Sequence, residues 1–204
     1  SNSPLLQQLH LFWNMFSTTI NTSNNPALKI FSCGMQSGPG IPSLDLSNNT
    51  ALTHLECMEN NLTSLDVSML PALKELNFSF NSLTSIDVSN NTALTILNCQ
   101  SNQLTGLLDT NNNPALEILC AWNNQIKGIS IIANPALNAL YAANNNLSKL
   151  LVANGNNTNF WVFIATGNPN LTCIQVDDQT WAYNNWWNFV EPIVSFVSSP
   201  NSCP

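Results

Sequence analysis

The sequence predicts a mainly β solenoid, in which short strands recur as the chain coils upon itself. Three observations predict this fold class. A unit of 21 residues repeats along most of the 204-residue chain, with slips of one to three residues between copies. Apolar residues alternate within each copy as they do in strands, and asparagines return at fixed positions.

The repeat begins early and continues almost to the end of the chain. Residues 50–70 read TALTHLECMENNLTSLDVSML, and residues 71–91 read PALKELNFSFNSLTSIDVSNN. Further copies occupy 92–113, 114–134 and 135–157. A diverged copy follows at 158–178, and earlier copies begin at residue 26 and, in degraded form, at residue 5. One copy cannot bury its apolar side alone, so we expect the copies to stack around a continuous core.

Each copy contains two strand-like halves. In the copy at 50–70 the apolar positions are Leu52, Leu55, Cys57, Leu62, Leu65 and Val67. The segment LTHLEC predicts a strand on one broad side of the coil, and LTSLDVS predicts a second strand on the other side. The repeat shows no helical period, so we expect flat coils with short parallel strands on both broad faces.

The asparagines predict how the corners of each coil are held. One column consists of Asn60, Asn81, Asn102, Asn124 and Asn145. A second consists of Asn49, Asn91, Asn112 and Asn134, interrupted by Leu70. Backbone groups that turn inward at a corner lose their contact with water. An asparagine amide both donates and accepts hydrogen bonds, so stacked asparagines are expected to form ladders that satisfy these groups.

The motif L-x-x-L-x-L-x-x-N-x-L recurs as LTHLECMENNL, LKELNFSFNSL and LTILNCQSNQL. With this motif the chain resembles the leucine-rich repeat family, and more narrowly the 21-residue nested leucine-rich repeat proteins that Bacteroidota secrete or display on the cell surface. The segment NPNLTCIQVDD, with the aromatic residues and the late cysteine that follow it, is similar to their C-terminal cap. The resemblance implies an extracellular location and an external partner, and it implies no fixed set of catalytic residues.

We therefore divide the chain into three parts. Residues 1–25 are expected to form a degraded N-terminal coil or cap, 26–178 the leucine-rich repeat solenoid, and 179–204 a tryptophan-rich C-terminal cap. Cys173 and Cys203 flank this cap. In a secreted protein we expect them to form a disulfide that closes the last coil over the end of the core, with a stabilisation of about 3 kcal/mol in the loop-entropy model.

The other cysteines fall at two kinds of position. Cys33, Cys57 and Cys99 occupy an inward position and are predicted to be small core hydrophobes. Cys120 occupies an outward position. It is either an exposed thiol that can pair between molecules, or a thiol partly covered by Trp122.

Composition excludes several classes of function. The net charge is −7 and only 7% of residues are charged, against about a quarter in ordinary domains. Four lysines and no arginine cannot neutralise a phosphate backbone, so nucleic acid is excluded as a partner. No apolar run approaches the roughly 20 residues of a transmembrane segment. The sequence shows no glycine-rich phosphate loop, metal-ligand cluster or nucleophile–base pair, so we predict no cofactor, no metal and no enzymatic activity.

A polar group is expected on the outward side of the early first strands. His54, Glu56, Glu75 and Asn77 should be neighbours there. A weak cation site or an acid–base pair is conceivable, but an open face without a pocket favours simple solvation. His10 is expected to stand alone on the surface of the first coil.

The same outward face becomes apolar and aromatic in the later copies. The predicted ligand-binding residues are Ile96, Ile118, Trp122, Tyr141 and Ile164. Apolar patches of this kind mark partner sites, and Trp and Tyr are favoured anchors. The alternative is that the cap or a neighbouring domain covers the patch. We predict a secreted or cell-surface recognition or adhesion module that binds an extracellular protein or polysaccharide.

Two alternatives have a different basis. The second strands of the early copies carry a Thr and Ser array at Thr63, Ser64, Thr84, Ser85 and Thr105. A flat array of this kind could order water, as in ice-binding solenoids, although the aspartates and the lapse of the pattern after residue 110 count against it. A third possibility is a structural spacer without a ligand.

Overall fold

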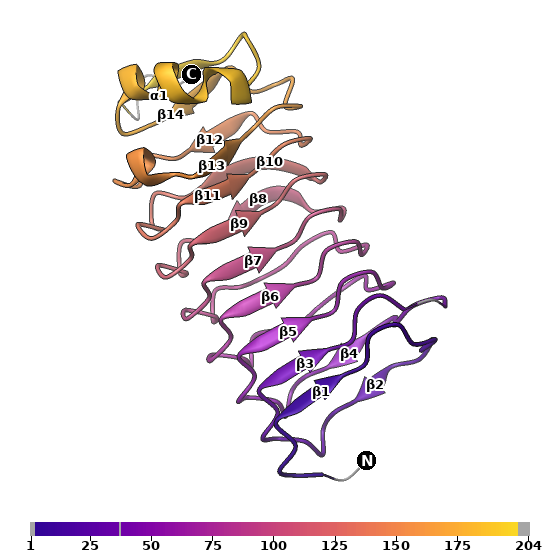
Figure 1. Cartoon of the computed structure of the whole chain (residues 1–204). Coiled ribbons are helices and arrows are strands. Elements are labelled where there is room, and N and C mark those ends of the chain that lie inside the picture. The colour runs from indigo at the N-terminus through magenta and orange to yellow at the C-terminus, as the bar shows by residue number, and fades with distance from the viewer. Residues whose placement is uncertain (1–2, 37, 200–204) are drawn as a thin grey trace.

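The computed structural model describes residues 3–36 and 38–199 and confirms the predicted fold class (Figure 1). One strand from each coil joins a parallel sheet of eight strands, which we call the long sheet. Its strands, in spatial order, are β1 (Gln8–His10), β3 (Ile30–Ser32), β5 (His54–Glu56), β6 (Glu75–Asn77), β7 (Ile96–Asn98), β9 (Ile118–Cys120), β11 (Ala139–Tyr141) and β13 (Val162–Ile164).

The register of the long sheet keeps equivalent residues of successive copies side by side. Leu55 of β5 lies beside Leu76 of β6, which lies beside Leu97 of β7. These central leucines are fully buried, whereas the residues on either side of each point outward. The alternation follows from the period of two in a strand, which sends one residue of each triplet into the core and two to the surface.

The opposite side of the solenoid carries two smaller parallel sheets. Two strands, β2 (Ile20–Asn21) and β4 (Leu44–Asp45), pair near the N-terminus. Five strands form the second, which we call the back sheet. They are β8 (Thr105–Asp109), β10 (Gln125–Ser130), β12 (Lys149–Leu151), β14 (Cys173–Gln175) and β15 (Ser195–Val197).

The expectation of a second strand in every copy is wrong for two coils. The structure assigns no strand within 62–68 or 83–89, both of which it describes fully. There the Ser68 and Ser89 N–H groups donate to the carboxylates of Asp66 and Asp87 in the same coil. Asp45 and Asp109 accept the same kind of bond at the ends of β4 and β8, so this bond does not by itself prevent a strand. The copy at 92–113 is one residue longer than the two copies before it, and its residues Thr105–Asp109 pair as β8.

The core is a continuous column of apolar side chains that runs through every coil. Cys33, Cys57 and Cys99 are fully buried and free, which confirms their prediction as core residues. At the same inward position other copies place Phe78 and Ala121, both fully buried. Side chains of such different size share one position, so the neighbouring coils must adjust their packing to each.

The first asparagine ladder is confirmed by its hydrogen bonds. The Asn102 amide donates to the carbonyl oxygens of Phe78, Cys99 and Gln100, at 3.1–3.2 Å, and its Oδ1 accepts from the Leu83 N–H at 3.0 Å. One side chain therefore joins its own coil to the coil before it. Asn60, Asn81, Asn124, Asn145 and Asn168 make equivalent bonds.

The second ladder differs from the prediction at one member. The buried residue is Asn113, whose amide donates to the Val88 and Asn91 carbonyls, whereas Asn112 is exposed. The extra residue of this copy shifts the column by one. Leu70 fills the same place with a fully buried hydrocarbon side chain.

The turn before each first-ladder asparagine uses left-handed backbone. The φ angle is +52 to +54° at Glu59, Phe80, Ser101, Asn123 and Asn144. Non-glycine residues seldom adopt this conformation, and it persists only where the surroundings enforce it. We attribute it here to the two anchors of each corner, the strand on one side and the buried asparagine on the other.

The C-terminal part adds the main helical structure. Two single 3₁₀ turns, η1 (Asn157–Asn159) and η2 (Trp187–Phe189), flank the last coils, and α1 (Gln179–Trp186) lies across the end of the solenoid (Figure 1). Asp178 caps α1 by accepting from the Thr180 and Trp181 N–H groups. Trp186 stacks on Phe163 of β13 with ring centroids 4.0 Å apart, so the helix covers the core at this end.

The described part of the cap ends at residue 199. Cys173 is buried in β14, but Cys203 lies outside the described residues, so its disulfide with Cys173 stays a prediction, as do the boundaries of the three parts. In the described parts of the chain, no helix has the length and apolar character needed to cross a membrane.

We expect Asn102→Ala to lower the free energy of unfolding by about 2 to 3 kcal/mol, because buried backbone groups of Leu83 and Phe78 lose their partner. Urea titration followed by circular dichroism measures the change. Asn112→Ala is the matched control, since Asn112 is exposed and should change stability little. Equal losses in the two variants would contradict the ladder's role.

Candidate functional site

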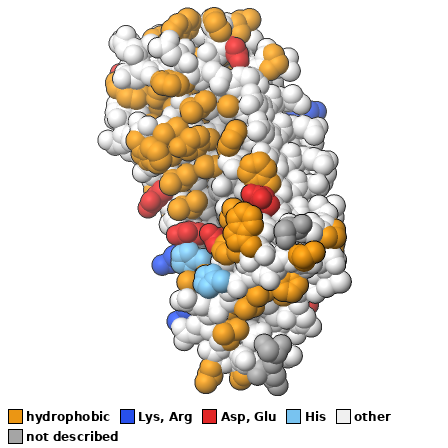
Figure 2. All heavy atoms as spheres, turned by 45° about the vertical axis from the view of Figure 1, so that its right-hand side comes forward, with side chains coloured by type: hydrophobic (Ala, Val, Ile, Leu, Met, Phe, Trp, Pro, Cys, Tyr) orange, Lys and Arg blue, Asp and Glu red, His pale blue; other side chains and the backbone are white. Residues whose placement is uncertain are grey.

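Two kinds of side chain divide the outward face of the long sheet. Figure 2 shows both histidines beside acidic side chains over the N-terminal coils, and hydrophobic side chains gathered more densely over the C-terminal coils. This division follows the sequence, because equivalent outward positions are polar in the early copies and apolar in the later ones.

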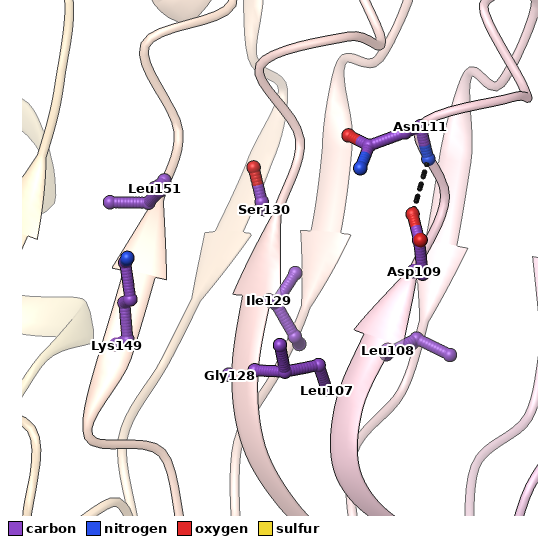
Figure 3. A pocket seen from close by; sticks show the side chains of 9 residues that line it. All are labelled: Leu107, Leu108, Asp109, Asn111, Gly128, Ile129, Ser130, Lys149 and Leu151. Atoms are coloured by element: carbon purple, nitrogen blue, oxygen red, sulfur yellow. Dashed lines mark hydrogen bonds between the residues drawn. The ribbon is translucent and has the colours of Figure 1, made fainter.

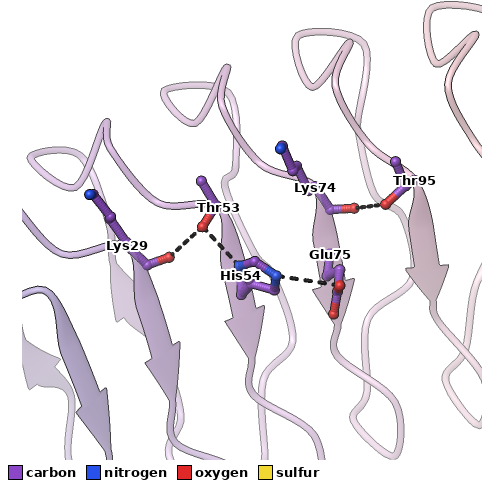
Figure 4. Close-up of polar contacts among 6 residues, drawn as sticks. All are labelled: Lys29, Thr53, His54, Lys74, Glu75 and Thr95. Carbon is purple, nitrogen blue, oxygen red and sulfur yellow. Dashed lines mark hydrogen bonds and ion pairs between the residues drawn. The ribbon is translucent and has the colours of Figure 1, made fainter.

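The polar end is a set of paired side chains. His54 Nε2 lies 3.3 Å from Glu75 Oε1, and its Nδ1 lies 2.8 Å from Thr53 Oγ1 (Figure 4). The buried Ser32 hydroxyl donates to Glu56 Oε2 at 2.8 Å. These groups lie on neighbouring strands, as predicted, and they satisfy one another.

His10 does not stand alone, contrary to the expectation. Its Nδ1 lies 3.2 Å from Ser32 Oγ on the next strand of the long sheet. Among the described residues no group of three or more His, Cys, Asp or Glu side chains is arranged to hold a metal ion. The polar end therefore offers paired contacts on an open face.

The five predicted ligand-binding residues lie along the later strands of the long sheet. Ile96 of β7 pairs with Ile118 of β9, and Tyr141 of β11 pairs with Ile164 of β13. Trp122 lies two residues beyond the end of β9. All five side chains are half-buried, so the patch is flatter and more closely packed than freely exposed side chains would make it. We call these five residues the apolar stripe.

Trp122 is held in place by a polar contact. Its indole N–H donates to the side-chain oxygen of Gln100 on the preceding coil. The ring therefore has a fixed orientation, and a partner that contacts it need not order it.

A pocket continues the apolar stripe beyond its last strand. It has a volume of about 270 Å³ and lies between β13 and the helical cap. Ile164 belongs both to the stripe and to the pocket wall. The other lining residues are Phe160, Trp161, Val162, Phe163, Trp181, Asn185, Trp186 and Phe189. We call it the cap pocket.

The sequence did not predict the cap pocket. The aromatic run in the cap is visible in the sequence, but the diverged copy at 158–178 conceals that Phe160 and Trp161 lie beside it. The signal that could have found the pocket is the density of aromatic residues within 160–189. Only the fold shows that these residues meet.

A smaller pocket, of about 170 Å³, lies on the back sheet (Figure 3). Leu107 of β8 is 76% exposed and extends over Gly128 of β10. A Cβ at Gly128 would come within 2.5 Å of the Leu107 side chain, so the missing side chain makes room for it. Lys149 and Asp109 lie at its margins.

Burial raises the pKa of the free thiols, which lowers the fraction present as the reactive thiolate. It raises the pKa of Cys33 to about 12 and that of the half-buried Cys120 to about 11. Burial also raises the pKa of Cys57 well above its ordinary value, with a smaller contribution from Cys33. Of the two interpretations of Cys120, the structure supports the partly covered thiol.

Comparisons with known proteins place the fold among leucine-rich repeat solenoids. The functional domain of InlJ from Listeria monocytogenes is 28% identical, with a TM-score of 0.58. The leucine-rich repeat protein LIC12759 of Leptospira interrogans is 17% identical, with a TM-score of 0.56. A plant ice-binding protein is 18% identical, with a TM-score of 0.55.

The likeness covers most of this chain but not of every neighbour. The shares of this chain are 85%, 84% and 96%, and the shares of the three neighbours are 44%, 62% and 77%, in the same order. This chain thus spans less than half the length of the InlJ domain. No model of a known protein family matches the chain, and no curated protein sequence does. The resemblance to leucine-rich repeat proteins is confirmed as a likeness of fold.

We expect Cys120 to react with a disulfide reagent at pH 8 about 100-fold more slowly in the folded chain than after unfolding. Its pKa is raised from 9.0 to about 11, and each unit lowers the thiolate fraction tenfold. Cys120→Ser identifies this thiol in the kinetics. Fast reaction of a single folded-state thiol that disappears in Cys120→Ser would contradict the expectation.

The same shift gives a dependence of stability on pH. A thiol with a raised pKa keeps its proton longer in the folded state, so its contribution is complete below a pH of about 9 and is lost as the pH rises toward 11. Urea midpoints at pH 7, 9 and 10.5 should fall mainly above pH 9, and the fall should be smaller in Cys120→Ser relative to its own value at pH 7.

Proposed function

We propose that the chain is a non-enzymatic recognition or adhesion module, secreted or displayed on a cell surface, that binds an extracellular protein or polysaccharide through the long sheet. The observation that carries the proposal is the apolar stripe. It runs across four consecutive strands of the long sheet, β7, β9, β11 and β13, and leads into the cap pocket. Association with a partner would remove the apolar surface of this face from water, which favours binding.

The stripe has the anchors that binding surfaces favour. Trp122 and Tyr141 are large side chains with few rotatable bonds, and Trp122 is already held by Gln100. Binding to a rigid sheet loses less conformational entropy than binding to a mobile loop. The open polar end, with His54 and Glu75, would then contribute specificity at the margin of the contact.

The extracellular location is also a proposal. It is supported by the resemblance to secreted and surface leucine-rich repeat proteins of Bacteroidota, and by the fold shared with the InlJ domain. Burial of four free thiols, half-complete for Cys120, would protect them in an oxidising environment.

The Ser and Thr array supports ice binding less well. Ser64 and Ser85 lie in the two coils that have no second strand, so this part of the surface is not a regular sheet. Hydrogen bonds from Ser68 and Ser89 lower the pKa of the exposed Asp66 and Asp87 carboxyls, which keeps negative charges within the array. The likeness to the plant ice-binding protein extends to the fold alone.

The experiment is a screen of the purified chain against extracellular proteins and polysaccharides, in which each hit is measured again with variants. We expect Trp122→Ala and Tyr141→Ala each to weaken binding about tenfold or more. Ile132→Ala is the control, since Ile132 is 45% exposed just after β10, on the opposite side. Thermal unfolding checks that each variant is folded.

The outcomes separate the possible functions. Binding lost in Trp122→Ala and Tyr141→Ala but kept in Ile132→Ala supports recognition through the stripe. Binding that all three variants retain contradicts the stripe as the site. An absence of hits, together with ice crystals that change shape in the presence of the chain, would contradict recognition and support the ice-binding alternative. An absence of both would leave the spacer.

A further inference from the structure

We propose that the cap pocket binds one ring of a neutral carbohydrate. The proposal deepens the proposed function and rests on it, because the pocket lies at the end of the same face and shares Ile164 with the apolar stripe. It assigns a chemical class of ligand to a particular set of side chains.

The first argument is the chemistry of the pocket wall. Phe160, Trp161, Trp181 and Phe189 supply aromatic rings, and none of the lining residues carries a charge. The face of an aromatic ring is electron-rich. A sugar ring has a face of weakly positive C–H groups, so the two faces stack, and the absence of charge favours a neutral ligand over an ionic one.

The second argument is the orientation of Trp161. Its side chain is 61% exposed, and its indole N–H donates to Asn138 Oδ1 at 2.8 Å. Its backbone N–H also donates to the Asn138 carbonyl at 3.0 Å. Asn138 thus holds both the backbone and the indole of this exposed tryptophan. Because the side chain is ordered before a ligand arrives, less conformational entropy is lost on binding.

The third argument is a polar group at the pocket. Asn185 of α1 is exposed, and its Nδ2 donates to the Trp181 carbonyl at 2.8 Å. This bond fixes the amide, and the hydrogen bonds of the described residues leave its Oδ1 as an acceptor. A carbohydrate hydroxyl is a donor of the right kind. Sites for small ligands are usually lined by apolar and aromatic side chains, with a few polar groups that orient the ligand.

The size of the pocket selects a small unit. A volume of about 270 Å³ lies just below the range of about 300 to 1,000 Å³ that is typical of sites for drug-sized ligands. It suits one ring, with the rest of a saccharide chain extending over the stripe toward Tyr141. A quaternary ammonium ion would also suit aromatic walls. No carboxylate lines the pocket, however, and we therefore favour the neutral ring.

The experiment measures binding to the full chain by calorimetry and by tryptophan fluorescence. The probes are hexasaccharides of β-1,4-glucose, α-1,4-glucose, β-1,4-mannose and β-1,4-N-acetylglucosamine, with choline as the cationic probe, at concentrations up to about 10 mM. We expect at least one saccharide to bind with a Kd of about 1 mM or below. Trp161→Ala should weaken this binding about tenfold or more.

Two variants make the result specific. Trp13→Ala is the matched control, because Trp13 is 73% exposed at the other end of the solenoid, and it should bind the saccharide as the unchanged chain does. Asn185→Ala should weaken binding about threefold or more, through the lost acceptor. Trp161 and Asn185 are exposed, so both variants should remain folded.

Each result has a definite meaning. No binding to any saccharide, binding of choline alone, or saccharide binding that Trp161→Ala leaves unchanged would overturn the inference. These results do not decide the proposed function, which is tested by Trp122→Ala and Tyr141→Ala with a separate partner. A partner lost in those two variants and kept in Trp161→Ala would leave recognition by the stripe intact without the sugar site.

Discussion

The buried asparagine amide is the interaction on which the rest of the structure depends. At each corner the chain turns back on itself and brings carbonyl and N–H groups into the core, where water cannot reach them. Asn102 shows how one side chain satisfies groups from two coils at once. Without this amide, the inward-facing backbone groups of Leu83 and Phe78 would be buried without a hydrogen-bond partner.

This division of labour explains why the surface is free to vary. The ladders and the central leucines hold the coils together, so the outward residues of the long sheet can differ between copies without changing the fold. The early coils use that freedom for His54 and Glu75, and the later coils use it for Ile118 and Tyr141. The same backbone can therefore present a polar end and an apolar end, and the end of the solenoid is the place where an aromatic cap meets the apolar one.

Most of the fold was predictable because the same pattern of inward and outward positions recurs in every copy. The inward positions, the first asparagine column and the outward placement of the apolar stripe follow from counting residues. The predictions failed where the repeat changed length and where a half-repeat formed no strand. Asn113 replaces Asn112 because one copy has an extra residue, and residues 62–68 and 83–89 form no strand although their apolar residues alternate as in the other copies. The cap pocket could not be predicted in this way. Its walls come from the diverged copy at 158–178 and from the helical cap, and neither follows the 21-residue period.

Because the register of the long sheet is regular, distances along its outward face are whole multiples of one strand spacing. From β5, which carries His54, to β13, which borders the cap pocket, there are five strand spacings, or about 24 Å. Because each copy brings its own ladder asparagines and core residues, gaining or losing one copy would change this span by one spacing and leave each end unaltered. The number of copies therefore sets the distance between the polar end and the apolar end. Duplication or deletion of one copy would match the chain to a partner of different length without changing the residues at either end.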